Sequence, residues 1–214
     1  MNLDQRATFD VLYLSNSKLT NGGSNGGVAT CVNTSRTSLK ISSLFGVVGS
    51  KVLSSLLTHS SSFLRSIDIA KNNLSGKGAK AIVDALKYNF SLTHLNVSHN
   101  AIGKEGAIAF AEFIFKNVTL SSLDLSANNL ETVGVSNLAE ALKGNKSLLK
   151  LDLSGNELMT QEWLLSEEGG AFCGITSLAE ALRGSKYNST LQTLLLSNRT
   201  CWKLVSTVKG WGWK

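Results

Sequence analysis

Apolar residues recur along the chain at a fixed spacing. The pattern L-x-x-L-x-L-x-x-N-x-L opens at Leu64 and again at Leu92, Leu120 and Leu148, so that successive copies begin 28 residues apart. A constant period of this length is typical of a solenoid, in which each repeat buries its apolar face only by stacking on its neighbours. The spacing therefore predicts regular repeats over residues 64–158.

Each repeat divides into a strand, a turn and a helix. Residues 120–125, Leu-Ser-Ser-Leu-Asp-Leu, alternate apolar and polar side chains, which predicts a short strand with one buried face. Asn128 follows, where its side chain can bond backbone groups exposed as the chain turns. Gly134, Leu138 and Leu142 then share one stripe of an amphipathic helix, whose small first residue lets it begin close to the preceding turn. The equivalent turn asparagines, all expected to be buried, are Asn72, Asn100 and Asn156.

The pattern weakens towards the N-terminus, where we expect two degenerate repeats over residues 9–63. The first keeps a strand pattern over 9–14, but a glycine-rich stretch at 21–27 replaces its helix. The second has a strand around Leu39, and we expect its helix to carry Gly49 and Leu53.

The C-terminal part departs from the period through an insertion. Leu130 and Gly134 are four residues apart, whereas the equivalent Leu158 and Gly174 are sixteen apart, so twelve extra residues lie within 159–173. This places an insertion in the repeat over residues 148–190, and a last strand is expected over 191–199. Residues 1–199 then form a single domain of about seven repeats. Residues 200–214 are a tail that is either a partial cap or disordered.

The 28-residue unit resembles the ribonuclease-inhibitor-like leucine-rich repeat family, most closely at 123–130 (LDLSANNL) and 151–158 (LDLSGNEL). The resemblance implies an α/β horseshoe-shaped solenoid with a parallel sheet on the concave face and helices on the convex face. Members include ribonuclease inhibitors, the sensor ends of NOD-like immune receptors and the GTPase-activating protein of the Ran cycle. Ribonuclease inhibitors are very rich in cysteine, and this chain has three cysteines.

Composition narrows the class of protein. The chain is 43% hydrophobic and 17% charged, and it holds no apolar run near the roughly 18 residues of a membrane-spanning helix. The net charge is +6, but the lysines are dispersed beside the expected helices, which argues against a nucleic-acid partner.

Cysteine usage bears on the compartment. Cys31, Cys173 and Cys201 are far apart and odd in number, and the first residues lack the apolar segment of a signal peptide, which favours a cytoplasmic location. Eight N-x-S/T sequons argue the other way. Four of them, however, begin three residues before the first leucine of a repeat, so the repeat itself accounts for them. Their asparagines are Asn89, Asn117, Asn145 and Asn188.

Alternation along each strand assigns side chains to the concave face. The central exposed position of the successive strands reads Tyr13, Lys40, Asp68, Asn96, Asp124, Asp152 and Leu195. Of these, Asp68, Asn96, Asp124 and Asp152 are predicted to bind a partner, together with the flanking His94 and Lys150. The alternative is that L-D-L-S-x-N is simply the usual pattern of such repeats. The arrangement lacks any diagnostic metal-ligand spacing, so we expect no metal and no cofactor.

The insertion contributes one further candidate, Trp163. Loops longer than about 12 residues in compact domains are usually functional or disordered, and tryptophan is enriched at binding hot spots. Trp163 is therefore predicted to contact a partner. The alternative is that it packs, with Leu164 and Leu165, onto the next helix.

The sequence contains no G-x-S-x-G, phosphate-binding glycine loop or H-E-x-x-H motif, so it predicts no enzyme. The leading hypothesis is a non-catalytic module that binds another protein through its concave sheet and inserted loop, within an intracellular scaffold or sensor. The alternative is a GTPase-activating protein of the Ran-regulator type, for which Arg36 and Arg65 are the candidate arginines. That group, however, has more than seven repeats and a long acidic tail, whereas this chain ends basic and aromatic.

Overall fold

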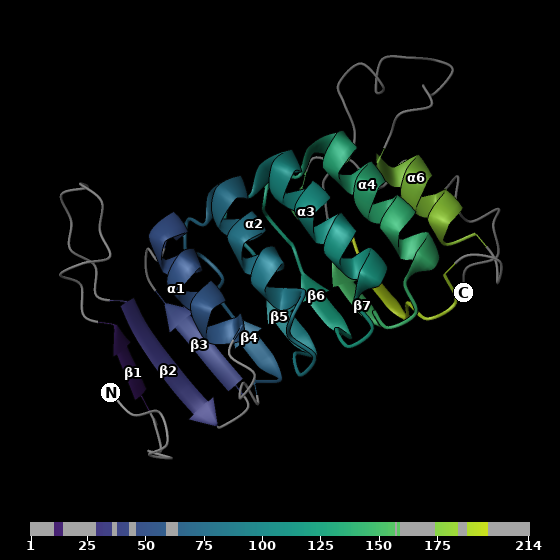
Figure 1. The fold of residues 1–214 in the computed structure, drawn as a ribbon. Coiled ribbons are helices and arrows are strands. Elements are labelled where there is room, and N and C mark those ends of the chain that lie inside the picture. Colours follow the sequence, from purple (N-terminus) through teal and green to yellow (C-terminus); the bar gives the residue numbers. More distant parts are fainter. Residues whose placement is uncertain are drawn as a thin grey trace.

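The computed structural model describes residues 11–14, 29–35, 38–42, 46–58, 64–156, 158, 174–183 and 188–196. These residues form one eight-stranded sheet whose strands follow one another in chain order, with helices along one side (Figure 1). The strands are β1 (Val11–Leu14), β2 (Ala29–Ser35), β3 (Ser38–Ser42), β4 (Ser66–Asp68), β5 (His94–Asn96), β6 (Ser122–Asp124), β7 (Lys150–Asp152) and β8 (Thr193–Leu195). The helices are α1 (Gly46–Thr58), α2 (Ser75–Leu86), α3 (Gly103–Lys116), α4 (Glu131–Gly144) and α6 (Gly174–Ala181).

Strands β3 to β8 are parallel, and each pairs with the next in the register that the leucine spacing predicts. Leu39, Ile67, Leu95, Leu123, Leu151 and Leu194 lie side by side across the sheet. Helices packed side by side lie 8–10 Å apart, whereas strands lie about 4.8 Å apart, so a stack of such repeats bends with its sheet on the inner side. The fold is the expected α/β solenoid of leucine-rich repeats, and the side of the sheet away from the helices is called the concave face below.

The N-terminal strands correct one expectation. Strand β1 pairs antiparallel with β2, and β2 pairs antiparallel with β3. Tyr13 therefore lies opposite Thr30 instead of extending the concave column beside Lys40. A parallel connection needs a crossover of a dozen or more residues, usually a helix, and the glycine-rich stretch at 21–27 is a poor helix former. Strand β2 has no leucine pattern, so the spacing did not predict it; β3 and α1 alone continue the parallel stack.

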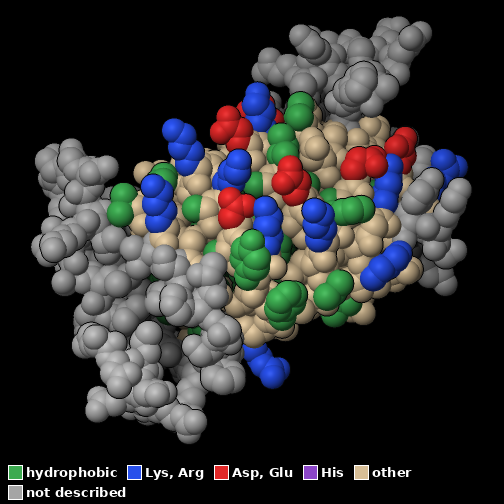
Figure 2. Space-filling model, in the orientation of Figure 1, with side chains coloured by type: hydrophobic (Ala, Val, Ile, Leu, Met, Phe, Trp, Pro, Cys, Tyr) green, Lys and Arg blue, Asp and Glu red, His purple; other side chains and the backbone are tan. Residues whose placement is uncertain are grey.

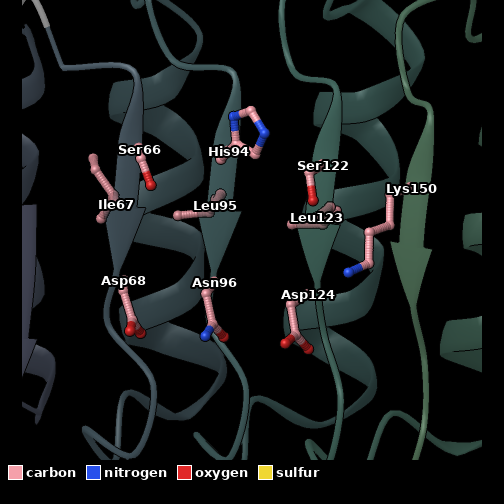
Figure 3. Close-up of a pocket in the computed structure, with 10 residues that line it drawn as sticks. All are labelled: Ser66, Ile67, Asp68, His94, Leu95, Asn96, Ser122, Leu123, Asp124 and Lys150. Atoms are coloured by element: carbon pink, nitrogen blue, oxygen red, sulfur yellow. The ribbon is translucent and has the colours of Figure 1, made fainter. Parts of the chain in front are cut away.

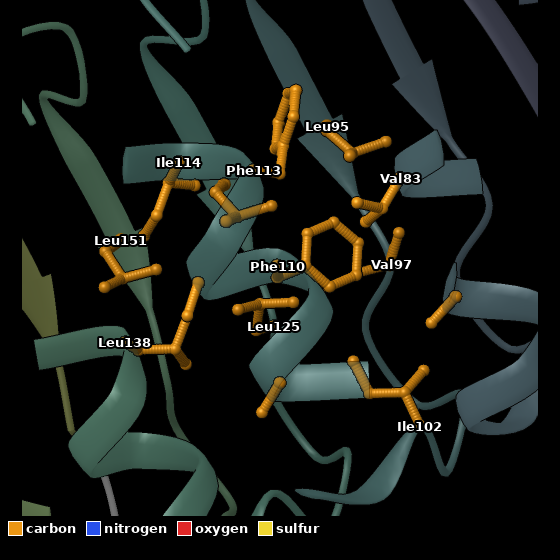
Figure 4. Packing of buried hydrophobic residues seen from close by; sticks show 14 of the residues in the cluster. Val83, Leu95, Val97, Ile102, Phe110, Phe113, Ile114, Leu125, Leu138 and Leu151 are labelled. Carbon is orange, nitrogen blue, oxygen red and sulfur yellow. The ribbon is translucent and has the colours of Figure 1, made fainter. Parts of the chain in front are cut away.

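The hydrophobic core lies between the sheet and the helices (Figure 4). Strand residues such as Leu95 and Leu123 meet helix residues such as Phe110 and Leu138, and all four are at most 2% exposed. Full burial of one such side chain stabilises the fold by about 1.5–3 kcal/mol. Because every repeat supplies the same positions, this core runs without interruption from α1 to α6.

Glycines set the distance between neighbouring helices. A Cβ atom built on Gly134 of α4 would lie 2.6 Å from the Cβ of Ala107 of α3, and one on Gly174 of α6 would lie 2.8 Å from the Cβ of Val135. Both distances are far shorter than van der Waals contact. Helices α4 and α6 therefore each approach the preceding helix through a position where only glycine fits, which explains the small residue that opens their helical stripes.

The structure buries all four turn asparagines. The amide oxygen of Asn100 accepts the backbone N–H of Asn72 in the preceding repeat at 2.8 Å, and its Nδ2 donates to the carbonyl of Ile69 at 2.9 Å. Asn128 and Asn156 make the same pair of contacts with the repeat before them. These side chains form a continuous row that holds successive turns at one spacing.

The turn between strand and helix also has a repeated backbone conformation. Residues in the left-handed region recur at three equivalent places, of which Lys71, His99, Ala127 and Gly155 occupy the first, Asn73, Ala101 and Asn129 the second, and Ser75, Gly103 and Glu131 the third. Because the strain recurs in successive repeats, we attribute it to the fold and not to a site.

Several sequence-based expectations fall outside the described residues. They concern Trp163 and the rest of the insertion, Arg36, and the tail over 200–214.

Candidate protein-binding face

The concave face carries a row of side chains that is polar from Lys40 to Asp152 and ends in Leu195. Strand pairing places Lys40, Asp68, Asn96, Asp124, Asp152 and Leu195 next to one another, one from each parallel strand. In each of β4 to β7, the residue just before the row member is buried. Because side chains alternate along a strand, the row faces away from the core. The row is what alternation along the strands predicts, except that Tyr13 is not part of it.

Four members of the row also hold the backbone. In each, one side-chain oxygen accepts the N–H of the residue two positions later, where the strand ends and the turn begins. The bonds run from the N–H of Ala70 to Asp68 (3.1 Å), Ser98 to Asn96 (2.9 Å), Ser126 to Asp124 (2.9 Å) and Ser154 to Asp152 (2.9 Å). Aspartate and asparagine therefore recur here partly for a structural reason. Each bond fixes the orientation of its side chain. The second carboxylate oxygen of the aspartates, or the amide NH2 group of Asn96, takes no part in it.

Strands β4 to β7 enclose a shallow hollow of about 290 Å³ on this face (Figure 3). Asp68, Asn96 and Asp124 lie along its edge at the strand ends, whereas His94 and Lys150 lie towards the strand starts. Pockets for drug-sized ligands measure about 300–1,000 Å³ and bury most of the ligand. An open hollow of this size fits one or two side chains of a protein partner.

Five of the seven predicted contact residues line this hollow: Asp68, His94, Asn96, Asp124 and Lys150. Asp152 lies beside Asp124 on the adjoining strand. Trp163 lies outside the described residues, so its position relative to the hollow is not defined.

Charge is distributed unevenly over the hollow. Lys40 forms an ion pair with Asp68 at 3.1 Å, and since the two side chains are 58% and 30% exposed, water screens the pair and it contributes little to stability. Within the described residues, Asp124, Asp152 and Lys150 form no ion pair. The face therefore offers two adjacent carboxylates, Asp124 and Asp152, and Figure 3 shows the ammonium group of Lys150 extending towards the strand that carries Asp124.

His94 is held in place by its neighbour. Its Nδ1 lies 2.8 Å from the hydroxyl of Thr93, whose hydroxyl also lies 3.0 Å from the carbonyl oxygen of Arg65. The ring remains exposed at the strand start, where Figure 3 shows it beside Ser66 and Ser122.

The described residues contain no cluster of three or more histidine, cysteine, aspartate or glutamate side chains that would hold a metal ion. None of the described helices combines the length and the apolar character needed to cross a membrane.

The sequence reasoning missed two features. Asn89, Asn145 and Asn188, read only as parts of sequons, are buried and form a second structural row at the opposite edge of the sheet. Next to that row, Tyr88, Phe90, Phe115 and Val118 are exposed apolar side chains. The sequence could have identified these four residues, because each is apolar at a position where another repeat has lysine.

Comparison with known proteins agrees with this geometry. A family model described as leucine-rich repeat matches residues 60–83, 88–111, 116–139 and 144–161. These segments are leucine-rich repeats. No curated protein matches the chain.

Two solved structures share the fold. One is that of leiomodin-1 actin-binding site 2, with a TM-score of 0.58 and 16% identity over 78% of this chain and 87% of that one. The other is the tropomodulin C-terminal domain from Caenorhabditis elegans, with a TM-score of 0.58 and 14% identity over 75% of this chain and 89% of that one. At such low identity the likeness extends to the fold alone.

Proposed function

We propose that this chain is a non-catalytic module that binds another protein on the concave face of strands β3 to β8. The observation that carries the proposal is the row of fixed polar side chains along a shallow hollow, which holds five of the predicted contact residues. Leucine-rich repeats typically serve protein–protein interaction, and repetition supplies an extended surface without a single catalytic geometry.

The charges of the hollow indicate what the partner presents. A lysine or arginine side chain of the partner would lie over Asp124 and Asp152, which are partly exposed and whose second oxygens take no part in these backbone bonds. An acceptor group would lie near Lys150, which is exposed at the start of β7. Because the backbone bonds already fix the two carboxylates, little side-chain entropy is lost when the partner binds.

The insertion is the second part of the proposed interface. It follows Leu158, which lies six residues beyond Asp152 at the end of β7. Trp163 would then supply an aromatic anchor beside the charged hollow. Deletion of residues 159–170 should weaken binding by about 2 kcal/mol if this proposal is right.

Site-specific photo-crosslinking tests the location of the interface. A photoreactive residue at Ser122, in the hollow, should capture the partner, whereas the same residue at the exposed Lys80 of α2 should not. Actin is the first candidate to test, because the leiomodin-1 structure that shares this fold is that of an actin-binding site. Capture from Lys80 alone would place the interface on the helices and overturn the proposal.

We infer a ribonuclease-inhibitor-like subtype from the 28-residue period, and an intracellular scaffold or sensor as the setting. GTPase activation of the Ran-regulator type is the alternative, with Arg65 exposed just before β4 and Arg36 outside the described residues. Added protein should leave the hydrolysis rates of a panel of small GTPases unchanged; stimulation lost in Arg65→Ala would favour the alternative.

A further inference from the structure

Four apolar side chains are exposed at one edge of the molecule, where helices α2 and α3 lead back into the next strands. Tyr88 is 72% exposed, Phe90 75%, Phe115 57% and Val118 77%. Single exposed apolar residues are ordinary, but a group of them along one edge marks an interaction site. Figure 2 shows apolar side chains gathered beside lysines over the lower ends of these helices.

The four residues lie on neighbouring repeats. Phe90 and Val118 occupy equivalent positions 28 residues apart, and adjacent repeats are separated by roughly 5–10 Å. The ring of Phe115 lies over Gly144 in the following repeat, since a Cβ on that glycine would be 2.6 Å from the ring. The apolar side chains therefore form one surface that spans successive repeats.

Asparagine side chains hold this surface rigid. Phe90 lies between Asn89 and Ser91, and the Asn89 Oδ1 accepts the N–H of Ser91 at 3.1 Å and that of Leu92 at 2.9 Å. Val118 lies in the equivalent turn of the next repeat. There the Asn117 Oδ1 accepts the N–H of Thr119 at 3.0 Å and that of Leu120 at 2.7 Å.

The next asparagine ties this edge to the stack. The Nδ2 of Asn145 donates to the carbonyls of Ile114 at 2.6 Å and Asn117 at 3.1 Å. The spacing of neighbouring turns is thus fixed, and exposed aromatic side chains on a fixed backbone lose little freedom on binding.

The same edge is positively charged. The twelve residues of 87–90, 115–118 and 143–146 contain four lysines and no carboxylate. The carboxylates of Asp84, Glu112 and Glu140 lie one helical turn back; Asp84 pairs with Lys87 and Glu140 pairs with Lys143. The hydrogen bond that the Lys87 ammonium group donates to Asp84 raises the pKa of Lys87 above its ordinary value.

We propose that this edge, residues 87–90, 115–118 and 143–146, is a second protein-binding surface that takes an amphipathic segment bearing apolar and acidic side chains. The apolar side chains of the segment pack on Phe90, Phe115 and Val118. Its carboxylates meet Lys116 and Lys146, which are both exposed.

A lipid surface fits the edge less well. Asp84, Glu112 and Glu140 lie one turn, about 5.4 Å, behind it, which is within the ~8 Å screening length at physiological salt. Anionic headgroups would be repelled by these carboxylates, whereas a protein segment has carboxylates only where lysines face it. The edge is distinct from the concave face, so the two surfaces have the capacity to act at the same time.

Fluorescence anisotropy with a designed peptide tests the proposal. The probe is a labelled amphipathic helix of leucine and glutamate, and its controls are the matching leucine–lysine helix and vesicles containing phosphatidylserine. The acidic helix should bind, and Phe90→Ser with Val118→Ser should weaken it at least tenfold. The matched control Val133→Ser, which removes an exposed valine on α4, should leave the affinity unchanged.

Charge reversal gives a second, independent readout. Lys116→Glu with Lys146→Glu should weaken the acidic helix at least tenfold and strengthen the basic one. Amide chemical-shift changes should fall at 87–90 and 115–118 and spare Ser66, Asn96 and Ser122, so that failure here leaves the concave proposal standing. Equal binding of both helices, binding to vesicles alone, or full affinity in the serine variants would overturn the proposal.

Discussion

Asn100 joins two repeats through five side-chain hydrogen bonds. Its amide oxygen accepts the N–H groups of Asn72 and Leu74, and its Nδ2 donates to the carbonyls of Ile69, Val97 and Ser98. No other residue type of this size supplies a donor and an acceptor on one planar group, which explains why asparagine recurs at this turn.

Truncation of this side chain should be costly. Asn100→Ala leaves the buried N–H of Asn72 and the carbonyl of Ile69 without these partners, at about 1–3 kcal/mol per group. We expect the free energy of unfolding in urea to fall by roughly 2–5 kcal/mol. Asn137→Ala on the exposed face of α4 is the control and should change it by less than about 0.5 kcal/mol. A loss below about 1 kcal/mol for Asn100→Ala would contradict the role of the row.

Backbone conformation gives a second test at this scale. Gly103 has a φ of +63° with open space around it, and Ala101, two residues earlier, has a φ of +50°. A left-handed alanine costs about 1–2 kcal/mol, and glycine avoids that cost. Gly103→Ala should therefore destabilise the protein by about 1 kcal/mol, and Ala101→Gly should stabilise it by about 0.5 kcal/mol. Calorimetry should show melting midpoints displaced in opposite directions; shifts of the same sign would contradict the assigned turn.

Helices α3 and α4 approach each other closely at Gly134 of α4, which faces Ala107 of α3. Gly134→Ala adds a methyl group 2.6 Å from the methyl of Ala107, so it should destabilise the protein by about 1–3 kcal/mol although alanine is the better helix former. Exchanging the two residues, as Gly134→Ala with Ala107→Gly, should recover part of that loss. A double-mutant cycle in urea measures this coupling, and additive effects would show that the two helices do not meet there.

How far the sequence predicts an element depends on what holds it in place. Strands β4 to β7 were predicted because core leucines fix both their position and the face of each side chain, and that also placed Asp124 and Asp152 in one row. Strand β2 was not predicted because it is held by antiparallel pairing with β1 and β3. Such pairing does not require the 28-residue spacing of leucines from which the other strands were predicted. The exposed edge was missed because Phe90 and Val118 contribute to no core, so no periodic rule identifies them.

The whole molecule presents two opposed surfaces on one stack. The concave face is formed by side chains that hydrogen bonds fix at the strand ends. The edge at residues 87–90, 115–118 and 143–146 is formed by turns that hydrogen bonds fix before the strand starts. In a solenoid, stability is close to a sum of repeat terms and neighbour terms. Substitutions on either surface should therefore leave the other intact.

Among the parallel strands that the structure describes, β8 is less covered than β4 to β7. Leu194 of β8 is partly buried, whereas the equivalent Leu123 and Leu151 are completely buried. The terminal repeat of a solenoid needs a cap that covers its apolar edge. The sequence predicts that 201–208 supplies one, and these residues lie outside the described part. Deletion of 200–214 should then lower the melting midpoint and the solubility; an unchanged midpoint would show that the tail is not a cap.

The most direct test of a protein-binding concave face is charge reversal at its two adjacent carboxylates. The measurement is the affinity of the partner captured at Ser122 for the intact chain with Asp124→Lys and Asp152→Lys. A control with the same change in net charge, Glu105→Lys with Glu180→Lys, alters exposed helix positions instead. We predict that the concave variant binds at least tenfold more weakly, about 1.4 kcal/mol, with an unchanged helical spectrum. Full affinity in that variant, with loss in the control, would contradict a concave interface and place it on the helices.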